Sequence, residues 1–290
     1  MKKLLIIALC LVMLFTFSAC SGAQFLSQAK VDNLVKKYSE NGKLPQFEMV
    51  LSYKTSKNST PMKIKVVYEL LLDKTPISAI SFINLLNSGR YQNVVVDSRN
   101  STYMEIGRFT CETKQDDSAA ERAYSMVKTT ATFAGEFKNN NFTPYGITAE
   151  GDDGFSKFEM FSLAMYHDAP AGKSDKEDQQ KEYKRAYSSA NGRLLLSLGS
   201  TQKGTAPDYK NYAVFARPVS FSVSIDGADF TNPVSQLDSY LLSQIQSVAS
   251  KTVSINGTNY TPIQIDVTFQ MVAGSIDWAN IKDNYLVEAE

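Results

Sequence analysis

The chain has 290 residues, of which 43% are hydrophobic, and its 30 basic and 30 acidic residues leave a formal net charge of zero. This composition supports a folded protein with a sizeable core, and the balanced charge argues against a nucleic-acid binder that works through a basic face. One histidine (His167) and three cysteines (Cys10, Cys20, Cys111) are too few for most zinc sites or for a disulfide framework. We therefore expect neither a metal nor a cofactor.

The first twenty residues have the pattern of an export signal. Lys2 and Lys3 precede an apolar run over 4–17, which is shorter than the about 20 residues that a transmembrane helix needs. The sequence Phe-Ser-Ala-Cys at 17–20 resembles a bacterial lipobox in which Cys20 is the lipidated residue. The alternative is an ordinary secretory signal that is cleaved nearby. Lipidation at Cys20 would hold the globular part at the extracytoplasmic face of the cell membrane.

Three helices are predicted along the rest of the chain. Apolar spacing over 26–41 predicts a short helix between the anchor and the domain, and Gly42 ends it. Thr75-Pro76 predicts the start of a helix that runs to residue 88, because proline suits the first helical position. Asn232-Pro233 predicts the start of a third helix, with an apolar stripe over 234–248.

The remaining elements are predicted to be strands. They fall at 47–53, 64–72, 94–96, 103–106, 158–165, 194–198, 212–215, 219–225, 253–255 and 263–271, and Asn256-Gly257 marks a hairpin turn. The charged run at 173–185 has the pattern of a solvated loop or exposed helix, with a docking surface as the alternative. About eight two-faced strands predict a closed or nearly closed antiparallel barrel whose ends two helices could cover.

Eight matches resemble the cyclophilin family, in the family's order, over residues 45–272. They are VYELLLDKTP at 67–76, FINLLNSG at 82–89, Tyr91, YMEIG at 103–107, GEF at 135–137, FSLAM at 161–165, NGRLLLSLG at 191–199 and YAVFAR at 212–217. The resemblance implies a mainly β fold, a closed eight-stranded antiparallel β-barrel capped by two α-helices. An extra N-terminal helix and long insertions at 54–61 and 112–190 account for the excess length. We expect the chain to be divided into a leader at 1–19, a lipidated cysteine with a linker helix at 20–42, a barrel domain at 43–275 and a C-terminal tail at 276–290.

The activity that the resemblance implies is peptidyl-prolyl cis-trans isomerisation, with proline-containing segments of exported proteins as partners. Amide resonance sets a barrier of ~18–20 kcal/mol. A positioned guanidinium can hydrogen-bond the prolyl nitrogen and favour the twisted state, while an apolar pocket holds the proline ring. This chemistry requires no nucleophile, metal or cofactor.

The family's catalytic arginine has no direct counterpart in this chain. An ungapped comparison puts Asp97 at the family's histidine and Ser98 at its arginine, and Arg99 follows one residue late. A shorter loop at 100–102 would bring Arg99 into the pocket, although strand alternation opposes such a slip. Arg99 is the candidate catalytic residue, and Arg193 is an alternative source of the positive charge.

The candidate substrate pocket is formed by residues at the family's pocket positions. Tyr103 and Met104 match a Phe-Met pair, Ile106 replaces a glutamine, Leu195 falls at an aromatic wall, and Tyr212 falls at a histidine or tyrosine. Plain barrel packing is the alternative for each of them. The resemblance is therefore stronger for the fold than for the catalytic groups.

Three functions are open on this basis. The first is an isomerase that assists the folding of exported proteins at the cell envelope. The second is a catalytically degenerate binding module or envelope-complex component, favoured by Ser98 and Ile106 at two polar positions. The third, a hydrolase, depends on His167 alone and has no Gly-x-Ser-x-Gly motif to support it.

Overall fold

A computed structural model describes residues 25–54, 59–113, 121–129, 131–146, 153–167, 189–225, 228–233, 239–272 and 278–288. The α-helices in these ranges are α2 (Gln28–Tyr38), α3 (Pro76–Asn87) and α5 (Ser239–Ser247). Single 3-10 turns are η2 (Lys138–Asn140), η3 (Thr201–Lys203), η4 (Tyr209–Asn211) and η6 (Trp278–Asn280). The predicted leader, the lipidation residue Cys20 and the charged run at 173–185 lie outside the described residues.

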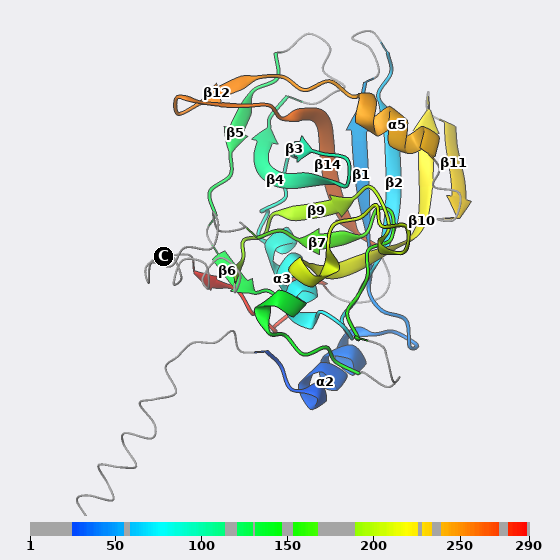
Figure 1. Ribbon diagram of the computed structural model, residues 1–290, viewed down its shortest axis with the longest axis vertical. Helices are drawn as coiled ribbons and strands as arrows, with labels where there is room; N and C mark the ends of the chain where they lie inside the picture. Colours follow the sequence, from blue (N-terminus) through cyan, green and yellow to red (C-terminus); the bar gives the residue numbers. More distant parts are fainter. Residues whose placement is uncertain are drawn as a thin grey trace, which may run out of the picture.

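Most of the described chain is β-structure. The strands are β1 (Gln46–Tyr53), β2 (Met62–Leu70), β3 (Val94–Arg99), β4 (Tyr103–Cys111), β5 (Tyr124–Met126), β6 (Ala131–Ala134), β7 (Leu163–Met165), β8 (Ser189–Ala190), β9 (Leu194–Ser197), β10 (Ala213–Ile225), β11 (Ala228–Pro233), β12 (Val253–Ile255), β13 (Thr258–Tyr260), β14 (Ile263–Met271) and β15 (Val287–Glu288). Eight pair in the order β10-β2-β1-β14-β3-β4-β9-β7, and β7 pairs again with β10. Every neighbouring pair is antiparallel (Figure 1). The structure confirms the predicted mainly β, closed eight-stranded antiparallel barrel.

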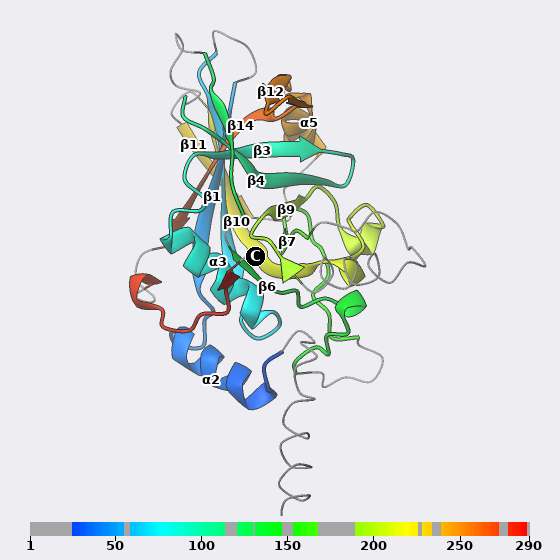
Figure 2. The same cartoon turned by 90° about the vertical axis from the view of Figure 1, so that its left-hand side faces the viewer.

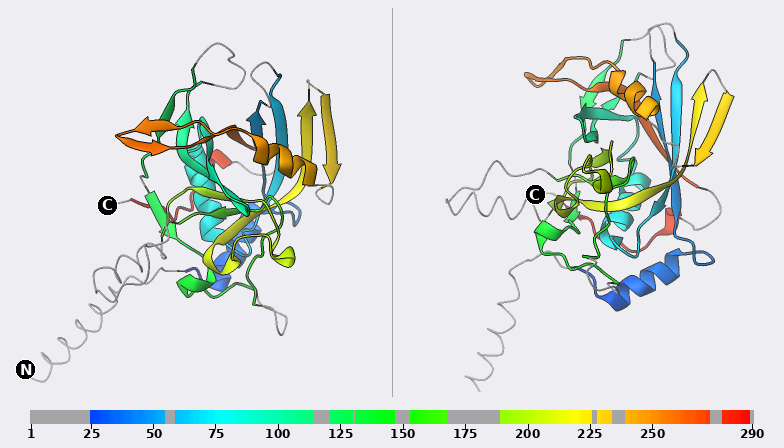
Figure 3. Two further views of the ribbon diagram at one scale, coloured as in Figure 1. Left: turned by 45° about the horizontal axis from the view of Figure 1, so that its top comes forward. Right: turned by 45° about the vertical axis from the view of Figure 1, so that its right-hand side comes forward.

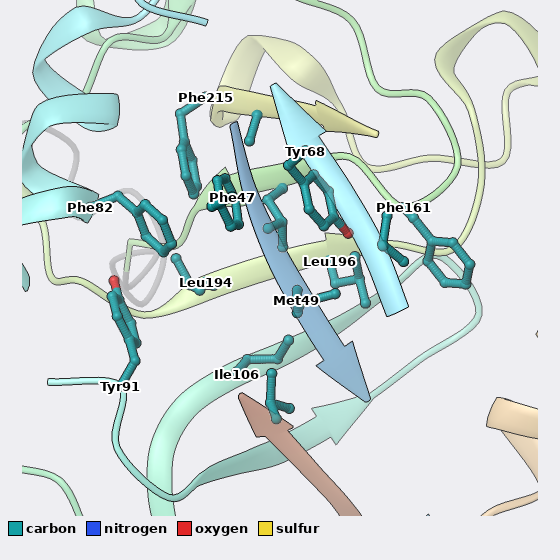
Figure 4. Packing of buried hydrophobic residues seen from close by; sticks show 14 of the residues in the cluster. Phe47, Met49, Tyr68, Phe82, Tyr91, Ile106, Phe161, Leu194, Leu196 and Phe215 are labelled. Carbon is teal, nitrogen blue, oxygen red and sulfur yellow. The ribbon is translucent and has the colours of Figure 1, made fainter. Parts of the chain in front are cut away.

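The barrel interior is filled by alternate side chains of its strands. Every second residue of β1 and β2 is buried, because successive side chains of a strand point to opposite faces. Phe47 of β1 stacks on Tyr68 of β2 with ring centroids 5.0 Å apart. Figure 4 shows these rings beside Leu194 and Leu196 of β9. This packing fixes the opposite, outward-facing set of residues on each strand.

Helices α3 and α5 lie at opposite ends of the barrel (Figures 1 and 2). Pro76 begins α3, and most side chains of the helix are buried, because it lies across an open end of an apolar interior. Its Phe82 contacts Phe47 and Phe215, with ring centroids 4.7 and 5.1 Å apart. Ile245 of α5 belongs to the same core cluster. The two helices therefore cover the ends of the barrel.

Helix α2 packs under the same end as α3 (Figure 2). Its Leu34 and Tyr38 are buried in the barrel's core cluster. The Asp283 carboxylate in the C-terminal segment accepts hydrogen bonds from Lys37 Nζ and Tyr38 Oη, both at 2.6 Å. The Asn84 side chain of α3 donates to the Asp283 carbonyl at 3.0 Å. The expected linker helix and tail thus contribute contacts to the packed body.

Asn232-Pro233 does not begin a helix, contrary to the prediction. These residues end β11, where Pro233 pairs with Ser220 of β10, and α5 begins only at Ser239. In the described residues β11 pairs with β10 alone. An edge position of this kind tolerates proline, whose missing N–H would break a central ladder.

The strand predicted at 158–165 is limited to 163–165. Phe161 adopts φ 64°, in the left-handed region, and a residue in that region cannot continue a strand. The hairpin predicted at Asn256-Gly257 is confirmed, because both residues have positive φ and join β12 to β13. Figure 3 shows this hairpin standing out from the barrel wall. Within the described ranges, no helix has the length and apolar character needed to cross a membrane.

Candidate functional site

Outward-facing residues of five adjacent strands form a continuous row on the barrel wall. The register pairs Ser98 with Glu105, Glu105 with Leu195, Leu195 with Ala164, and Ala164 with Val214. Directly opposed residues of antiparallel strands share one face of the sheet. Three members of the row, Leu195, Ala164 and Val214, are buried in a cluster distinct from the barrel interior. This row, together with Arg193 and the rings that cover it, is called the outer-face site below.

Rings from neighbouring segments cover the apolar part of the outer-face site. The partly buried residues that pack against it are Tyr103, Tyr166, Tyr209, Tyr212 and Ala206. The Tyr212 ring lies 6.4 Å from the rings of both Phe158 and Tyr166. These aromatic walls give the site the apolar lining that binding pockets for small cyclic groups usually have.

A β-bulge in β3 decides which residue of that strand faces outward. The register between β3 and β4 shifts between Val96 and Ser98. The Asp97 carboxylate at the bulge accepts the backbone N–H groups of Arg108 at 2.7 Å and Phe109 at 2.9 Å. Burial raises the pKa of Asp97 to about 7, although these two hydrogen bonds oppose the shift. The extra residue reverses the alternation of the strand beyond this point.

Arg99 is directed away from the outer-face site by this bulge. It pairs with Met104, a residue of the barrel interior, so it lies on the inner side of β3. Its Nη1 donates to the Ile245 carbonyl near the C-terminal end of α5 at 2.9 Å. The register leaves Ser98 opposite Glu105, at the position of the family's arginine in the ungapped comparison.

Arg193 supplies a guanidinium to the outer-face site instead. Its Nη2 donates to Glu105 Oε2 at 2.5 Å, and its Cζ lies 4.1 Å from the centroid of the Tyr166 ring. The side chains of Arg193 and Glu105 are only 6% and 12% exposed. Arg193 lies two residues before Leu195, and strand alternation therefore puts both side chains on one face.

Gly192 fixes the chain direction just before Arg193. Its φ is +74°, which favours glycine, and a Cβ there would lie 2.8 Å from Leu85 Cδ1. Tyr91 Oη donates to the Gly192 carbonyl at 2.8 Å. A larger residue at 192 would therefore displace the backbone that positions Arg193.

His167 lies in an aromatic stack at the border of the outer-face site. Its ring stacks on Phe137 at 4.7 Å and approaches Tyr212 at 5.3 Å. Its Nε2 lies 2.5 Å from the Asn211 carbonyl oxygen. The ring is 3% exposed, so its contacts are those of a packed residue rather than those of a solvent-accessible general base.

The structure brings together three of the six residues predicted from the sequence. Tyr103, Leu195 and Tyr212 all belong to the outer-face cluster. Met104 and Ile106 are fully buried inside the barrel, where Figure 4 shows Ile106. Arg99 lies at the α5 end, as described above.

Glu105 and Tyr166 are members of the site that the sequence reasoning missed. Glu105 lies two residues after Tyr103, and this spacing on one strand was an available signal. Tyr166 follows the end of β7, and its contact with Arg193 depends on pairing between distant strands. In the described part of the chain, no group of three His, Cys, Asp or Glu side chains could hold a metal ion.

The described residues thus form a closed antiparallel barrel with a buried arginine and aromatic rings on one outer wall. Neither a family model nor a curated protein matches this chain. The chain is similar to a crystal structure of a cyclophilin-type peptidyl-prolyl cis-trans isomerase from Cryptosporidium parvum, with 11% identity and a TM-score of 0.35, over 79% of this chain and 98% of that one. A structure of that isomerase in the presence of the dipeptide Ala-Pro is similar with 12% identity and a TM-score of 0.32, over 78% and 99%.

Proposed function

We propose that the outer-face site binds proline-containing segments of polypeptides and accelerates the cis-trans exchange of X-Pro bonds. The observation that carries this proposal is the buried guanidinium of Arg193 beside an apolar floor with tyrosines around it. A proline ring requires an apolar surface, and a twisted X-Pro amide requires a hydrogen-bond donor near its nitrogen. The order of cyclophilin-like segments along the sequence supports the same function.

The proposed mechanism is electrostatic. The X-Pro bond resists rotation because its nitrogen shares a lone pair with the carbonyl, which sets a barrier of ~18–20 kcal/mol for amides. Twisting localises that lone pair, and an N–H of Arg193 donates to it. Glu105 accepts a hydrogen bond from Arg193 Nη2 and so fixes the orientation of the guanidinium before the substrate binds. Tyr103 and Tyr212, which are partly exposed and pack over Leu195, contact the proline ring.

The test is exchange NMR on a series of short Ala-Pro peptides with the full chain in detergent. Arg193→Lys and Arg193→Met should reduce the exchange rate by at least tenfold, because each variant lacks the planar guanidinium that Glu105 orients. Arg99→Ala is the matched control and should leave the rate unchanged. Loss of activity in Arg99→Ala with activity kept in Arg193→Met would reverse the assignment.

A second candidate function is binding without catalysis. It is favoured by the ion pair between Arg193 and Glu105, which already occupies part of the guanidinium, and by Ser98 at the family's arginine position. In this case the peptides bind and the wild-type chain does not accelerate their exchange. A binding titration of the same peptides, together with the exchange measurement, separates the two functions.

We further propose that the protein acts on exported proteins from a lipid anchor at Cys20. The apolar run at 4–17 and the sequence that ends at Cys20 support this proposal. Mass spectrometry of the membrane-extracted protein should show a mature N-terminus at Cys20 that carries acyl chains. Cys20→Ser should release the protein from the membrane fraction, and retention of that variant would contradict the anchor.

A further inference from the structure

His167 contacts both the ring of Tyr212 and the backbone that carries it. The His167 ring lies 5.3 Å from the Tyr212 ring, with 34° between the ring planes. The rings of Phe158 and Tyr166 lie farther from Tyr212, each at 6.4 Å. His167 Nε2 lies 2.5 Å from the carbonyl oxygen of Asn211, the residue directly before Tyr212. Because a carbonyl oxygen can only accept, Nε2 carries the hydrogen, and the bond fixes the peptide plane that leads into Tyr212.

His167 is itself held by two rigid parts of the fold. It follows directly after Tyr166, whose backbone N–H donates to the Arg193 carbonyl at 2.8 Å. Its ring stacks on Phe137 at 4.7 Å, with 10° between the ring planes, and Phe137 is 1% exposed. The carboxylate of Glu136, the residue before Phe137, accepts backbone N–H groups at the start of α3. The barrel wall and α3 together therefore determine where the His167 ring lies.

Tyr212, in contrast, is a partly exposed residue of the outer-face site. It follows η4 and directly precedes β10, so its ring is not placed by the pairing of a barrel strand. A tyrosine in such a place has several staggered side-chain rotamers available unless its neighbours select one. A ring that is already fixed before a ligand arrives binds more tightly, because less rotamer freedom is lost on binding.

We propose that His167 is a positioning residue of the outer-face site, which holds the Tyr212 ring in the orientation that receives a proline ring. His167 acts through Tyr212 and does not touch the polypeptide, because it is only 3% exposed. The inference rests on the proposed function for the identity of the ligand. The orientation of Tyr212 is a property of the free protein and can be measured without any ligand.

The first test is a fluorescence anisotropy titration of labelled Ala-Pro peptides with the full chain in detergent. His167→Leu removes both contacts and should weaken binding per folded molecule by at least about fivefold, with circular dichroism as the check of folding. His167→Gln keeps an amide N–H that can reach the Asn211 carbonyl, and its affinity should lie between those of His167→Leu and the wild type. If the wild type binds and His167→Leu binds equally tightly, the proposal is overturned.

A double-mutant cycle separates positioning of Tyr212 from a general loss of packing. In a Tyr212→Ala background, His167→Leu should change the affinity by less than about twofold, because the residue that it positions is already absent. In a Tyr103→Ala background, the about fivefold loss should remain. Tyr103 is the matched control, because it is another partly buried tyrosine of the same cluster but lies on β4. An equal loss in both backgrounds would show that His167 does not act through Tyr212 and would overturn the proposal.

The second test uses the free protein and separates this inference from the proposed function. Three-bond Hα–Hβ couplings of Tyr212, measured on tyrosine-labelled protein and assigned with Tyr212→Phe, should be those of one χ1 rotamer in the wild type. In His167→Leu they should become averaged, while those of Tyr103 stay unchanged. A single Tyr212 rotamer kept in His167→Leu would overturn the proposal. A rotamer that depends on His167 in a protein that binds no Ala-Pro peptide would count against the proposed function alone.

Discussion

Arg193, just before β9, and Glu105 on β4 form an ion pair with 2.5 Å between Nη2 and Oε2, and both side chains are almost completely buried. Tyr166 covers the guanidinium on one side. A charge in such a place is stable only while its partner is present. The pair therefore couples the positioning of the functional arginine to the stability of the barrel wall.

The first prediction concerns this coupling. Glu105→Leu should lower the free energy of unfolding by roughly 3–5 kcal/mol, because it leaves the Arg193 charge buried and unpaired. The double variant Glu105→Leu/Arg193→Met should recover most of that loss. Urea unfolding of the single and double variants measures both values. Additive losses in the double variant would show that the two side chains are not coupled.

The second prediction concerns Arg99. Arg99→Ala removes the donor to the Ile245 carbonyl and should cost about 1–2 kcal/mol, localised at α5. Hydrogen exchange should therefore become faster in 243–248 and stay unchanged in β9. Peptide binding should not change. A loss of binding with intact exchange protection at α5 would assign Arg99 to substrate instead.

The third prediction concerns Met104 and Ile106, which fill the barrel interior. Ile106→Ala should cost roughly 2–5 kcal/mol in stability, because it leaves a cavity in a packed core. Binding of Ala-Pro peptides per folded molecule should stay the same. Tyr103→Ala, on the outer face, should show the reverse pattern, with weaker binding and a smaller stability loss. Urea unfolding and anisotropy on the same samples compare the two variants.

The fourth prediction concerns pH. The Glu136 carboxylate accepts hydrogen bonds from the backbone N–H groups of Ile77 at 3.1 Å and Ser78 at 2.8 Å, at the start of α3. Burial nevertheless raises its pKa from 4.5 to about 8. A folded-state pKa above the unfolded value means that folding takes up a proton. This contribution to stability is complete below pH 4.5 and is lost as pH rises through about 8.

Unfolding measured from pH 5 to 9 should therefore show stability that falls with pH, by at most about 1.4 kcal/mol per pH unit from this group. Glu136→Gln keeps an acceptor for the α3 N–H groups and removes the titration, so its pH slope should be shallower. Asp97, with a pKa raised to about 7, contributes a similar slope over a lower range and remains in the variant. Identical slopes in wild type and Glu136→Gln would contradict the shift.

The fifth prediction concerns α2. Removing residues 1–42 should destabilise the barrel, because Leu34 and Tyr38 would leave its core cluster and Asp283 would lose two donors. A lower midpoint in thermal unfolding, compared with the chain that begins at Cys20, measures the effect. An unchanged midpoint would show that α2 does not stabilise the barrel and is a separate linker, as the sequence predicted.

Local patterns of the sequence predicted most elements of the barrel, and the resemblance to a family implied its closure. The alternation over 263–271, the proline at the start of α3 and the turn at Asn256-Gly257 each predicted an element that the structure contains. Each pattern depends only on residues that are neighbours along the chain. Strand period, helix start and tight turn are decided at that range, whereas closure of the barrel depends on the long-range pairing of β7 with β10.

The site was decided by register, which no local pattern contains. The bulge at Asp97 exchanges the faces of Ser98 and Arg99 and depends on hydrogen bonds from β4. The pairing of Arg193 with Glu105 joins residues 88 positions apart. A shift by one residue turns every side chain of a strand to the other face, so only the paired sheet could show which arginine faces the outer wall.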